Sequence, residues 1–287
     1  GQRLVALARF KDGRVEDVTR KAQFNSLNDA VAEAADDGQV TVAARGATAV
    51  MVRYRGLATV ARMIAPYRDL PTFPDFPRAS YVDELVAARW KQMGLLPSPK
   101  STDAEYIRRV FLDVLGMLPT PEEVKAFLAD PDPKKREKLV DAVLNRPEYV
   151  DYWTLKWGDL LRNNSSKVQP KGMWSFYNWL RASFRENKPM DQFARELVTA
   201  QGSAYTTGPA NYFRVASNPA DLAETTSQVF LGVRLACAKC HHHPFEKWTQ
   251  DDYWQMAAFF ARVGLKGSQE FGIFGGEQVV RLNPTGE

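Results

Sequence analysis

The residues best suited to chemistry in this chain are gathered in one short stretch. Both cysteines and all three histidines of the 287 residues lie between positions 237 and 243, as Cys237, Cys240, His241, His242 and His243. Thiols and imidazoles are the side chains that most readily bind transition metals and haem. Chance scatter does not produce such a concentration, so the stretch predicts a single site.

Cys237, Cys240 and His241 have the C-x-x-C-H spacing that attaches c-type haem covalently. Two thiols three positions apart at the end of a helix can each add to one vinyl group of a single porphyrin. The histidine that follows then lies beneath the iron as its proximal ligand. We therefore predict that these three residues bind haem c.

The segment before the motif is expected to position it. Residues 219–240 predict one long apolar helix that ends at the cysteines. Its Val229, Phe230, Val233 and Leu235 are expected to line one side of a haem pocket.

A bare metal ion is the main alternative to haem. Cys237, Cys240, His241 and His243 together make a tetrahedral zinc set, in which His241 and His243 are the imidazole ligands. Structural zinc sites usually draw ligands from two separated segments, whereas these candidates share one tight loop. A redox-active C-x-x-C disulfide and a disulfide-stapled turn with surface histidines also stay open. A metal hydrolase built on His241 and His243 lacks a carboxylate at a recognisable spacing.

The motif does not determine which other residues would contact an iron. His242 is expected to face solvent. His243 precedes Pro244, which biases its backbone to an extended conformation. Contact of His243 with a propionate, a substrate or a second metal is compatible with this pattern, and so is plain surface exposure. A distal ligand is absent, or is a lysine, a tyrosine or one of the methionines Met93, Met117, Met173, Met190 and Met256.

Polar side chains in two other segments, around Arg162 and in the loop over residues 205–218, are candidates for lining a pocket. Arg162 lies three positions after Asp159 on an expected tryptophan-rich helix, where its guanidinium either holds a haem propionate or pairs locally with Asp159. The loop ahead of the motif helix forms either a pocket wall or a plain connection, and its polar residues are Tyr205, Tyr212, Arg214 and Asn218.

The first 66 residues alternate apolar and polar side chains between Asp-Gly turns, which is typical of a small antiparallel β-sandwich. The "DG…DVT" turn, the "DDGQVTVAARG" hairpin and the closing "VMVRYRGLATVARMIA" resemble a bacterial immunoglobulin-like domain of the second group. That resemblance implies a spacer or adhesive module on an exported protein. Residues 67–79 hold three prolines in seven positions and predict an extended linker.

From residue 80 the apolar residues recur with the helical period of 3.6. Gly94 is expected to end a first helix, whose apolar face carries Val82, Leu85, Val86 and Trp90. Later helix starts are marked by a threonine three positions before an acid, in Thr102 and Glu105, Thr120 and Glu123, and Thr249 and Asp252. The chain is therefore predicted to be multidomain β + α, with an immunoglobulin-like sandwich over 1–66, a linker over 67–79 and a mostly α-helical domain over 80–287.

Composition sets limits on the partners. The chain is 45% hydrophobic and 25% charged with a net charge of +4, and its cations are interleaved with acids. Because no basic run tracks a phosphate backbone, no nucleic-acid partner is expected. A run of 18 apolar residues is also missing, so no membrane-spanning segment is predicted.

Residues 80–263 resemble the planctomycete cytochrome-like family, a domain of unknown function. The matching pieces include "YVDELVAARWKQMGLLPSP", "DAEYIRRVFLDVLGMLPTPEEVKAFLAD" and "CAKCHHHPFEKWTQDDYWQMAAFFARV". The family pattern C-x-x-C-H-x-H-P-F maps onto Cys237, Cys240, His241, His243, Pro244 and Phe245. The resemblance implies a periplasmic or cell-surface protein with a c-type haem and a redox partner protein or small-molecule substrate. It also implies a further C-terminal domain in a longer chain.

Overall fold

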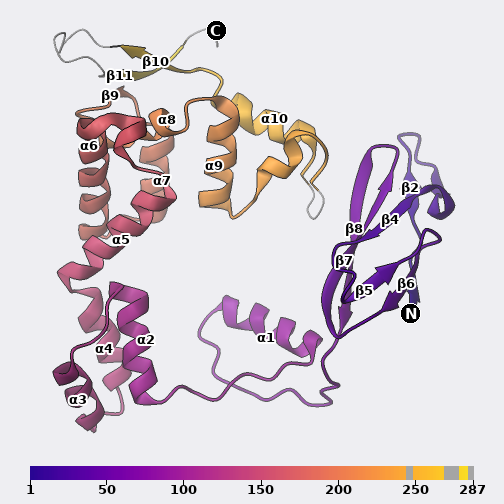
Figure 1. The fold of residues 1–287 in the computed structure, drawn as a ribbon, viewed down its shortest axis with the longest axis horizontal. Helices are drawn as coiled ribbons and strands as arrows, with labels where there is room; N and C mark the ends of the chain where they lie inside the picture. Colours follow the sequence, from indigo (N-terminus) through magenta and orange to yellow (C-terminus); the bar gives the residue numbers. More distant parts are fainter. Residues whose placement is uncertain (244–247, 268–277, 284–287) are drawn as a thin grey trace. The chain divides into compact units, whose positions relative to one another are not determined.

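The computed structural model describes residues 1–243, 248–267 and 278–283, and Figure 1 traces them. The chain divides into two compact units. The first unit comprises residues 1–99 and 235–254, and the second comprises residues 100–234 and 255–287. The linker over 67–79 has no helix or strand, while the predicted domain boundaries stay a prediction.

Short antiparallel sheets form the N-terminal part of the first unit. One sheet has the order β1-β6-β5, a second has the order β4-β7-β8, and β2 pairs with β3 as a hairpin. The strands are β1 (Gln2–Arg3), β2 (Leu7–Arg9), β3 (Val15–Asp17), β4 (Gln23–Ser26), β5 (Ala32–Ala34), β6 (Gln39–Val42), β7 (Gly46–Tyr54) and β8 (Leu57–Ala65), and the 3-10 helix η1 (Thr19–Lys21) lies before β4.

The two three-stranded sheets share one hydrophobic core. Phe24, Val50 and Val52 from the β4-β7-β8 sheet pack with Ala32 and Val40 from the β1-β6-β5 sheet. Because side chains alternate along a strand, Val50 and Val52 point to the same face of β7. The predicted β region is therefore confirmed as small antiparallel sheets around a buried core.

The helix that follows the linker is α1 (Tyr81–Met93), which ends at Gly94 with φ 67°, as predicted. On its predicted apolar face, Val82, Leu85 and Val86 are exposed, whereas Trp90 is half-buried, with its ring centroid 6.0 Å from that of Phe76. The 3.6-residue pattern thus located the helix but not the packing of this face.

The second unit is mainly helical, and its first helices begin where the sequence indicates. The side chains of Thr102 and Thr120 accept hydrogen bonds from the backbone N–H groups of Glu105 and Glu123, whose carboxylates bond back to the threonine N–H groups. The elements are α2 (Asp103–Leu115), α3 (Pro121–Ala129), α4 (Lys135–Leu144), α5 (Pro147–Leu160), α6 (Ser165–Arg185, interrupted at Gln169), α7 (Met190–Val198), η2 (Gly208–Asn211), α8 (Tyr212–Val215) and α9 (Pro219–Leu231).

Two cores hold this unit. The smaller one joins α2, α3 and α4 through Ile107, Phe111, Phe127 and Val143. The larger one joins α6, α7, α8 and α9, and Phe193 is at the centre of its aromatic side chains. The ring of Phe193 lies 4.7 Å from Trp179 and 5.0 Å from Trp157 between centroids. Aromatic contacts of this kind add to the free energy gained by burial.

The helical prediction needs two corrections near the motif. The helix expected over 219–240 stops at Leu231, because Gly232 adopts φ 66° and caps it. The helix expected over 249–263 is α10 (Gln250–Ala258), which is followed by β10 (Val263–Gly267) and β11 (Gln278–Leu282). These strands form a sheet of order β10-β11-β9 with β9 (Gly202–Ser203), which the sequence analysis missed.

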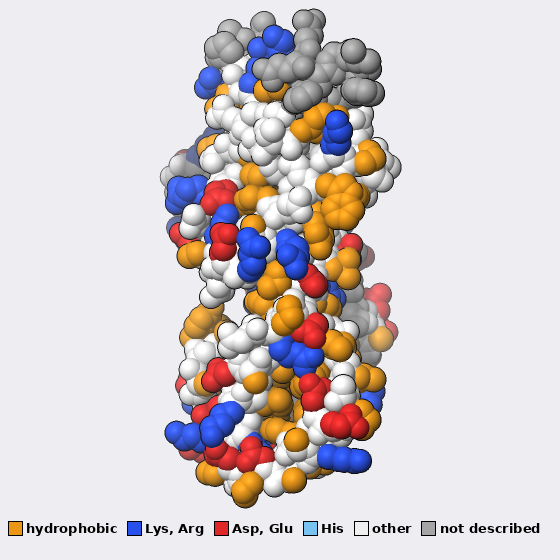
Figure 2. Space-filling model, turned by 90° about the vertical axis from the view of Figure 1, so that its left-hand side faces the viewer, with side chains coloured by type: hydrophobic (Ala, Val, Ile, Leu, Met, Phe, Trp, Pro, Cys, Tyr) orange, Lys and Arg blue, Asp and Glu red, His pale blue; other side chains and the backbone are white. Residues whose placement is uncertain are grey.

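The predicted fold class, a β region followed by a mainly α-helical domain, is confirmed. Across the described residues, none of the helices has both the length and the apolar character needed to cross a bilayer. On the face drawn in Figure 2, acidic and basic side chains are interspersed. Ion pairs such as Arg136 with Asp103 at 2.8 Å and Arg181 with Asp151 at 3.0 Å reflect this mixture.

Candidate functional site

The two cysteines lie on and just after a short 3-10 helix, η3 (Leu235–Lys239), in the first unit. Residues three apart eclipse one another in a 3-10 helix. Leu235 and Ala238 take the buried side, whereas Cys237 is half-buried and Cys240 is exposed. Both cysteines are free thiols. The local helix thus presents two accessible thiols at the spacing that the motif requires.

His241 is exposed, and its ring is oriented by the backbone of the next residue. Its Nδ1 lies 2.7 Å from the carbonyl oxygen of His242. A carbonyl only accepts, so Nδ1 carries the proton and donates it, and the lone pair of the neutral ring is on Nε2. A histidine ligand commonly uses one ring nitrogen for the metal and the other for a hydrogen bond to a carbonyl. His241 has the tautomer of an Nε2 ligand.

His242 is half-buried. Its Nδ1 accepts a hydrogen bond of 3.3 Å from the backbone N–H of Gln250, at the start of α10. The Gln250 side chain donates to the carbonyl oxygen of Lys239 at 3.0 Å. One residue of α10 therefore binds the motif on both sides of Cys240 and His241.

His243 is buried, with 6% of its surface exposed, so plain surface exposure is wrong for this residue. Its backbone N–H donates to the carbonyl oxygen of Trp248 at 2.7 Å. Thr249 and Asp252 then form the predicted capping box: the Asp252 carboxylate accepts from the Thr249 N–H at 2.8 Å, and Thr249 Oγ1 accepts from the Asp252 N–H at 3.1 Å. Pro244 and Phe245 of the family pattern lie outside the described residues.

The predicted metal-binding side chains are neighbours in the sequence but do not surround a common point in space. Within residues 1–243, 248–267 and 278–283, no three His, Cys, Asp or Glu side chains are grouped closely enough to hold a metal ion. A tetrahedral zinc site would need Cys237, Cys240, His241 and His243 to be drawn together. Attachment of a porphyrin needs two accessible thiols and one imidazole, which the segment displays.

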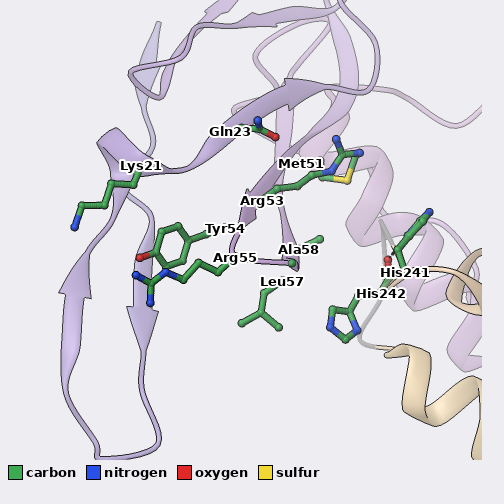
Figure 3. Close-up of a pocket in the computed structure, with 11 residues that line it drawn as sticks. Lys21, Gln23, Met51, Arg53, Tyr54, Arg55, Leu57, Ala58, His241 and His242 are labelled. Carbon is green, nitrogen blue, oxygen red and sulfur yellow. Dashed lines mark hydrogen bonds between the residues drawn. The ribbon is translucent and has the colours of Figure 1, made fainter.

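A cavity of about 480 Å³ adjoins the histidines within the first unit (Figure 3). His241 and His242 line one side of it. The other side is formed by η1, β4 and the β7–β8 hairpin, through Lys21, Gln23, Met51, Arg53, Tyr54, Arg55, Gly56, Leu57 and Ala58. The volume falls in the range of ligand-binding pockets. The cavity combines cationic and apolar side chains.

Sequence reasoning missed the contribution of the β region to this cavity. No chemistry-bearing motif marks Met51, Arg53 or Arg55, and the candidate iron ligands were sought among helical methionines. One signal was present in the sequence: "YRGL" places an arginine before a glycine in the short break between two strand-like runs, where a tight turn prefers asparagine or glycine. Met93 is buried at the end of α1 in the first unit, and the other four predicted methionines belong to the second unit.

Arg162 and the loop over 205–218 have structural partners. The Arg162 guanidinium donates to Asp221 at 3.1 Å and to Thr225 at 2.8 Å, rather than pairing with Asp159. Tyr212 is buried and its hydroxyl is 2.6 Å from that of Thr226; burial raises the pKa of Tyr212 to about 12.

The rest of that loop is likewise part of the helical core. Arg214 donates to the carbonyl of Val168 at 2.6 Å and to Gln278 at 2.9 Å, and burial lowers its pKa. Asn218 caps α9, since its side chain accepts from the backbone N–H of Asp221. Tyr212, Arg214 and Asn218 therefore have structural partners in the helical unit, whereas Phe213 of the same loop lines a separate cavity.

Fold and site together define a chain in which a small β region is followed by a mainly helical region, and in which a C-x-x-C-H turn with free thiols belongs to the same compact unit as the β region. The chain belongs to the family PSCyt2, a protein of unknown function (DUF1549), whose model matches residues 81–264. Cys237, Cys240 and the three histidines lie inside the match. No curated protein and no solved structure matches the chain. The resemblance to the cytochrome-like family is thereby confirmed, whereas no immunoglobulin-like family matches the N-terminal sheets.

Proposed function

We propose that the chain is an exported c-type haem protein that works in electron transfer or in haem-based redox chemistry. Cys237 and Cys240 are the attachment residues and His241 is the proximal ligand. The observation that carries the proposal is the hydrogen bond from His241 Nδ1 to the carbonyl of His242, at 2.7 Å. It leaves the Nε2 lone pair for iron, and it belongs to the residue directly after the second cysteine.

The state of the thiols supports the same assignment. In attachment, each sulfur adds across one vinyl group: the S–H bond breaks, an S–C bond forms, and the hydrogen goes to the neighbouring vinyl carbon. This reaction requires thiols, not a disulfide, and it requires access for the porphyrin. Cys237 and Cys240 are free, and neither is fully buried.

Bound haem would supply a one-electron Fe(III)/Fe(II) couple. The chain's own residues perform the remaining tasks. Leu235 and Ala238 anchor the 3-10 helix by burial, and Gln250 fixes the turn at Lys239 and His242. A redox partner protein or a small-molecule substrate would exchange electrons at the exposed side of this turn.

The cellular location of the protein and the role of its N-terminal sheets are also part of the proposal. Covalent haem attachment is expected in the periplasm or at the cell surface, so the chain is expected to be exported. Residues 1–66 then act as an immunoglobulin-like spacer that presents the helical domain.

The decisive experiment is intact-mass analysis with visible spectroscopy, on protein exported in cells that carry the c-type maturation system. A mass increment of one covalent haem with a Soret band is expected. Cys237→Ala or Cys240→Ala each removes one thioether, and the double variant abolishes the increment. Replacing the exposed Cys240 by serine tests whether loss of sulfur alone is sufficient.

The alternative is a binding module for a polysaccharide or protein partner, stabilised by a metal or a disulfide. Among these, a zinc site would use Cys237, Cys240, His241 and the buried His243, which would have to be drawn together around the ion. Colourless protein of unmodified mass that holds one zinc per chain, released in His243→Ala, would overturn the haem assignment in favour of this module.

A further inference from the structure

The floor of the cavity beside His241 is the outer face of the β4-β7-β8 sheet. Val50 and Val52 of β7 point into the core, so the intervening Met51 and the following Arg53 belong to the opposite face. Arg53 pairs with Gln23 of β4 and with Ala58 of β8. Paired residues on adjacent strands lie on the same face of a sheet. Gln23, Arg53 and Ala58 therefore form one row across the floor.

The tip of the β7–β8 hairpin adds a second arginine in an unusual backbone conformation. Tyr54 and Leu57 close a two-residue turn in which Arg55 has φ 46° and Gly56 has φ 79°. Positive φ at both positions is the type I′ geometry, which favours asparagine or glycine. A side chain such as arginine is strained in this conformation. A strained residue that lines a cavity indicates a functional role for its side chain.

All charged side chains that line the cavity are cationic. Three cations, Lys21, Arg53 and Arg55, line the cavity and no acid is among the lining residues. Lys21 is bonded to Glu16 at 2.8 Å. In the described part of the chain, neither Arg53 nor Arg55 forms an ion pair. Two such guanidinium groups suit carboxylates, which they bind through paired N–H···O bonds.

The remaining lining restricts the ligand further. Met51, Leu57 and Ala58 give the cavity apolar surface next to the arginines, and the Tyr54 ring lies 5.4 Å from Arg55 Cζ. Figure 3 shows Arg53 and Met51 extending from the sheet on the side of His241. The matching ligand has an apolar body with carboxylate groups.

We propose that Arg53 and Arg55 bind the carboxylates of an amphipathic ligand that occupies the cavity beside His241. A covalently attached haem supplies such carboxylates as its two propionates, and this source rests on the function proposed above. A free carboxylic acid with an apolar body has the same chemistry and does not depend on haem attachment.

The first test uses the haem-free full chain and two metal-free probes, mesoporphyrin IX and its dimethyl ester. Mesoporphyrin has no vinyl groups, so it cannot react with the thiols, and the ester lacks the negative charges. The double variant Arg53→Gln/Arg55→Asn keeps a residue that tolerates positive φ at the turn. We expect the Kd of the diacid, from fluorescence titration, to rise about tenfold or more, because charge-assisted hydrogen bonds contribute about 1.5–3 kcal/mol each. The Kd of the ester should not change.

The matched control is Arg9→Gln/Arg195→Gln, which removes two exposed arginines that do not line the cavity. It should leave both affinities unchanged. Equal binding of diacid and ester by the unmodified chain, or an equal loss in the control, overturns the carboxylate site.

The second test uses the matured protein and separates the two sources. Arg53→Gln/Arg55→Asn should keep the covalent mass increment, shift the propionate bending band in resonance Raman spectra, and lower the midpoint potential, since loss of positive charge favours the ferric state. If haem never attaches but the diacid is still preferred over the ester, the haem function fails and the carboxylate site stands. If haem attaches and neither the band nor the potential moves, the haem propionates are not bound by these arginines.

Discussion

The helical core of the second unit and the segment over residues 235–243, called the Cys-His turn below, are stabilised in different ways. In the core, Phe176, Phe193 and Tyr212 are completely or almost completely buried, and aromatic rings surround Phe193 on several sides. In the turn, Leu235 and Ala238 are buried while Cys240 and His241 are exposed, and Gln250 supplies two of the hydrogen bonds. The stability of the fold therefore comes from elements that carry no candidate chemistry. The candidate chemistry belongs to a short segment that remains open to a ligand.

The largest expected effect follows from removing the centre of the core. Phe193→Ala deletes a ring that contacts Trp157, Trp179 and Phe230, and it should lower the free energy of unfolding by about 3–5 kcal/mol. Denaturant unfolding followed by tryptophan fluorescence measures this change. Phe259→Ala is the control: Phe259 is 79% exposed, so a change within about 0.5 kcal/mol is expected. Similar unfolding midpoints for the two variants would show that the buried Phe193 ring stabilises the fold no more than the exposed Phe259 ring.

Two glycines that cap helices sharpen the comparison. Gly116 ends α2 with φ 69°, and a Cβ there would lie 2.3 Å from the Tyr152 ring. Gly232 ends α9 ahead of the motif with φ 66° and open space around it. Gly116→Ala combines backbone strain with a clash and should cost about 2–4 kcal/mol, whereas Gly232→Ala meets the backbone strain alone, about 1 kcal/mol. Thermal and denaturant unfolding of both variants would test the order, and an equal loss would contradict it.

Local signals explain why most helices were predictable. The capping boxes at Thr102, Thr120 and Thr249 and the glycine cap at Gly94 depend on residues within one turn of each other, and all four are confirmed. The helix predicted before the motif is too long because the apolar pattern continues past Gly232. Its positive φ decides the end of the helix, and sequence periodicity does not report φ.

Non-local contacts account for the parts that could not be predicted. The strand β9 pairs with β11 across more than seventy positions, so neither strand has a local signal of pairing. The exposure of α1 and the burial of His243 likewise depend on what packs against them. The cavity beside His241 joins residues near position 50 to residues near position 240, and only the chemistry of the Cys-His turn itself was visible in the sequence.

A smaller effect with a distinct pH dependence is expected at Tyr212, in the helical core. Tyr212→Phe leaves the buried Thr226 hydroxyl without its 2.6 Å partner and should cost about 1–3 kcal/mol at neutral pH. The pKa of Tyr212 is about 12 when folded, because burial disfavours the phenolate, whereas an unfolded tyrosine has a pKa of about 10. The stabilisation from the neutral phenol is therefore complete below pH 10 and is lost as the pH rises toward 12.

Unfolding free energies between pH 9 and 12 test this sign. The unmodified chain should lose stability more steeply than Tyr212→Phe over that range. Tyr81→Phe, at an exposed tyrosine, should follow the unmodified chain. Parallel alkaline profiles for all three proteins would show that Tyr212 ionises in the folded core as easily as in the unfolded chain.

The smallest expected change in stability concerns the turn itself. Gln250→Ala removes the amide donor to Lys239 but keeps the backbone N–H that bonds to His242. An exposed hydrogen bond contributes about 1 kcal/mol or less, so the unfolding midpoint should scarcely move. Hydrogen exchange across residues 237–243 should nevertheless become faster, because this bond ties the segment to α10. Gln192→Ala removes a comparable 3.0 Å bond to Glu196 on α7, where the helix retains its own backbone bonds, and exchange there should not change. If exchange in the turn is equally insensitive, burial of Leu235 and Ala238 is sufficient to hold it, and the turn is as preformed as the core.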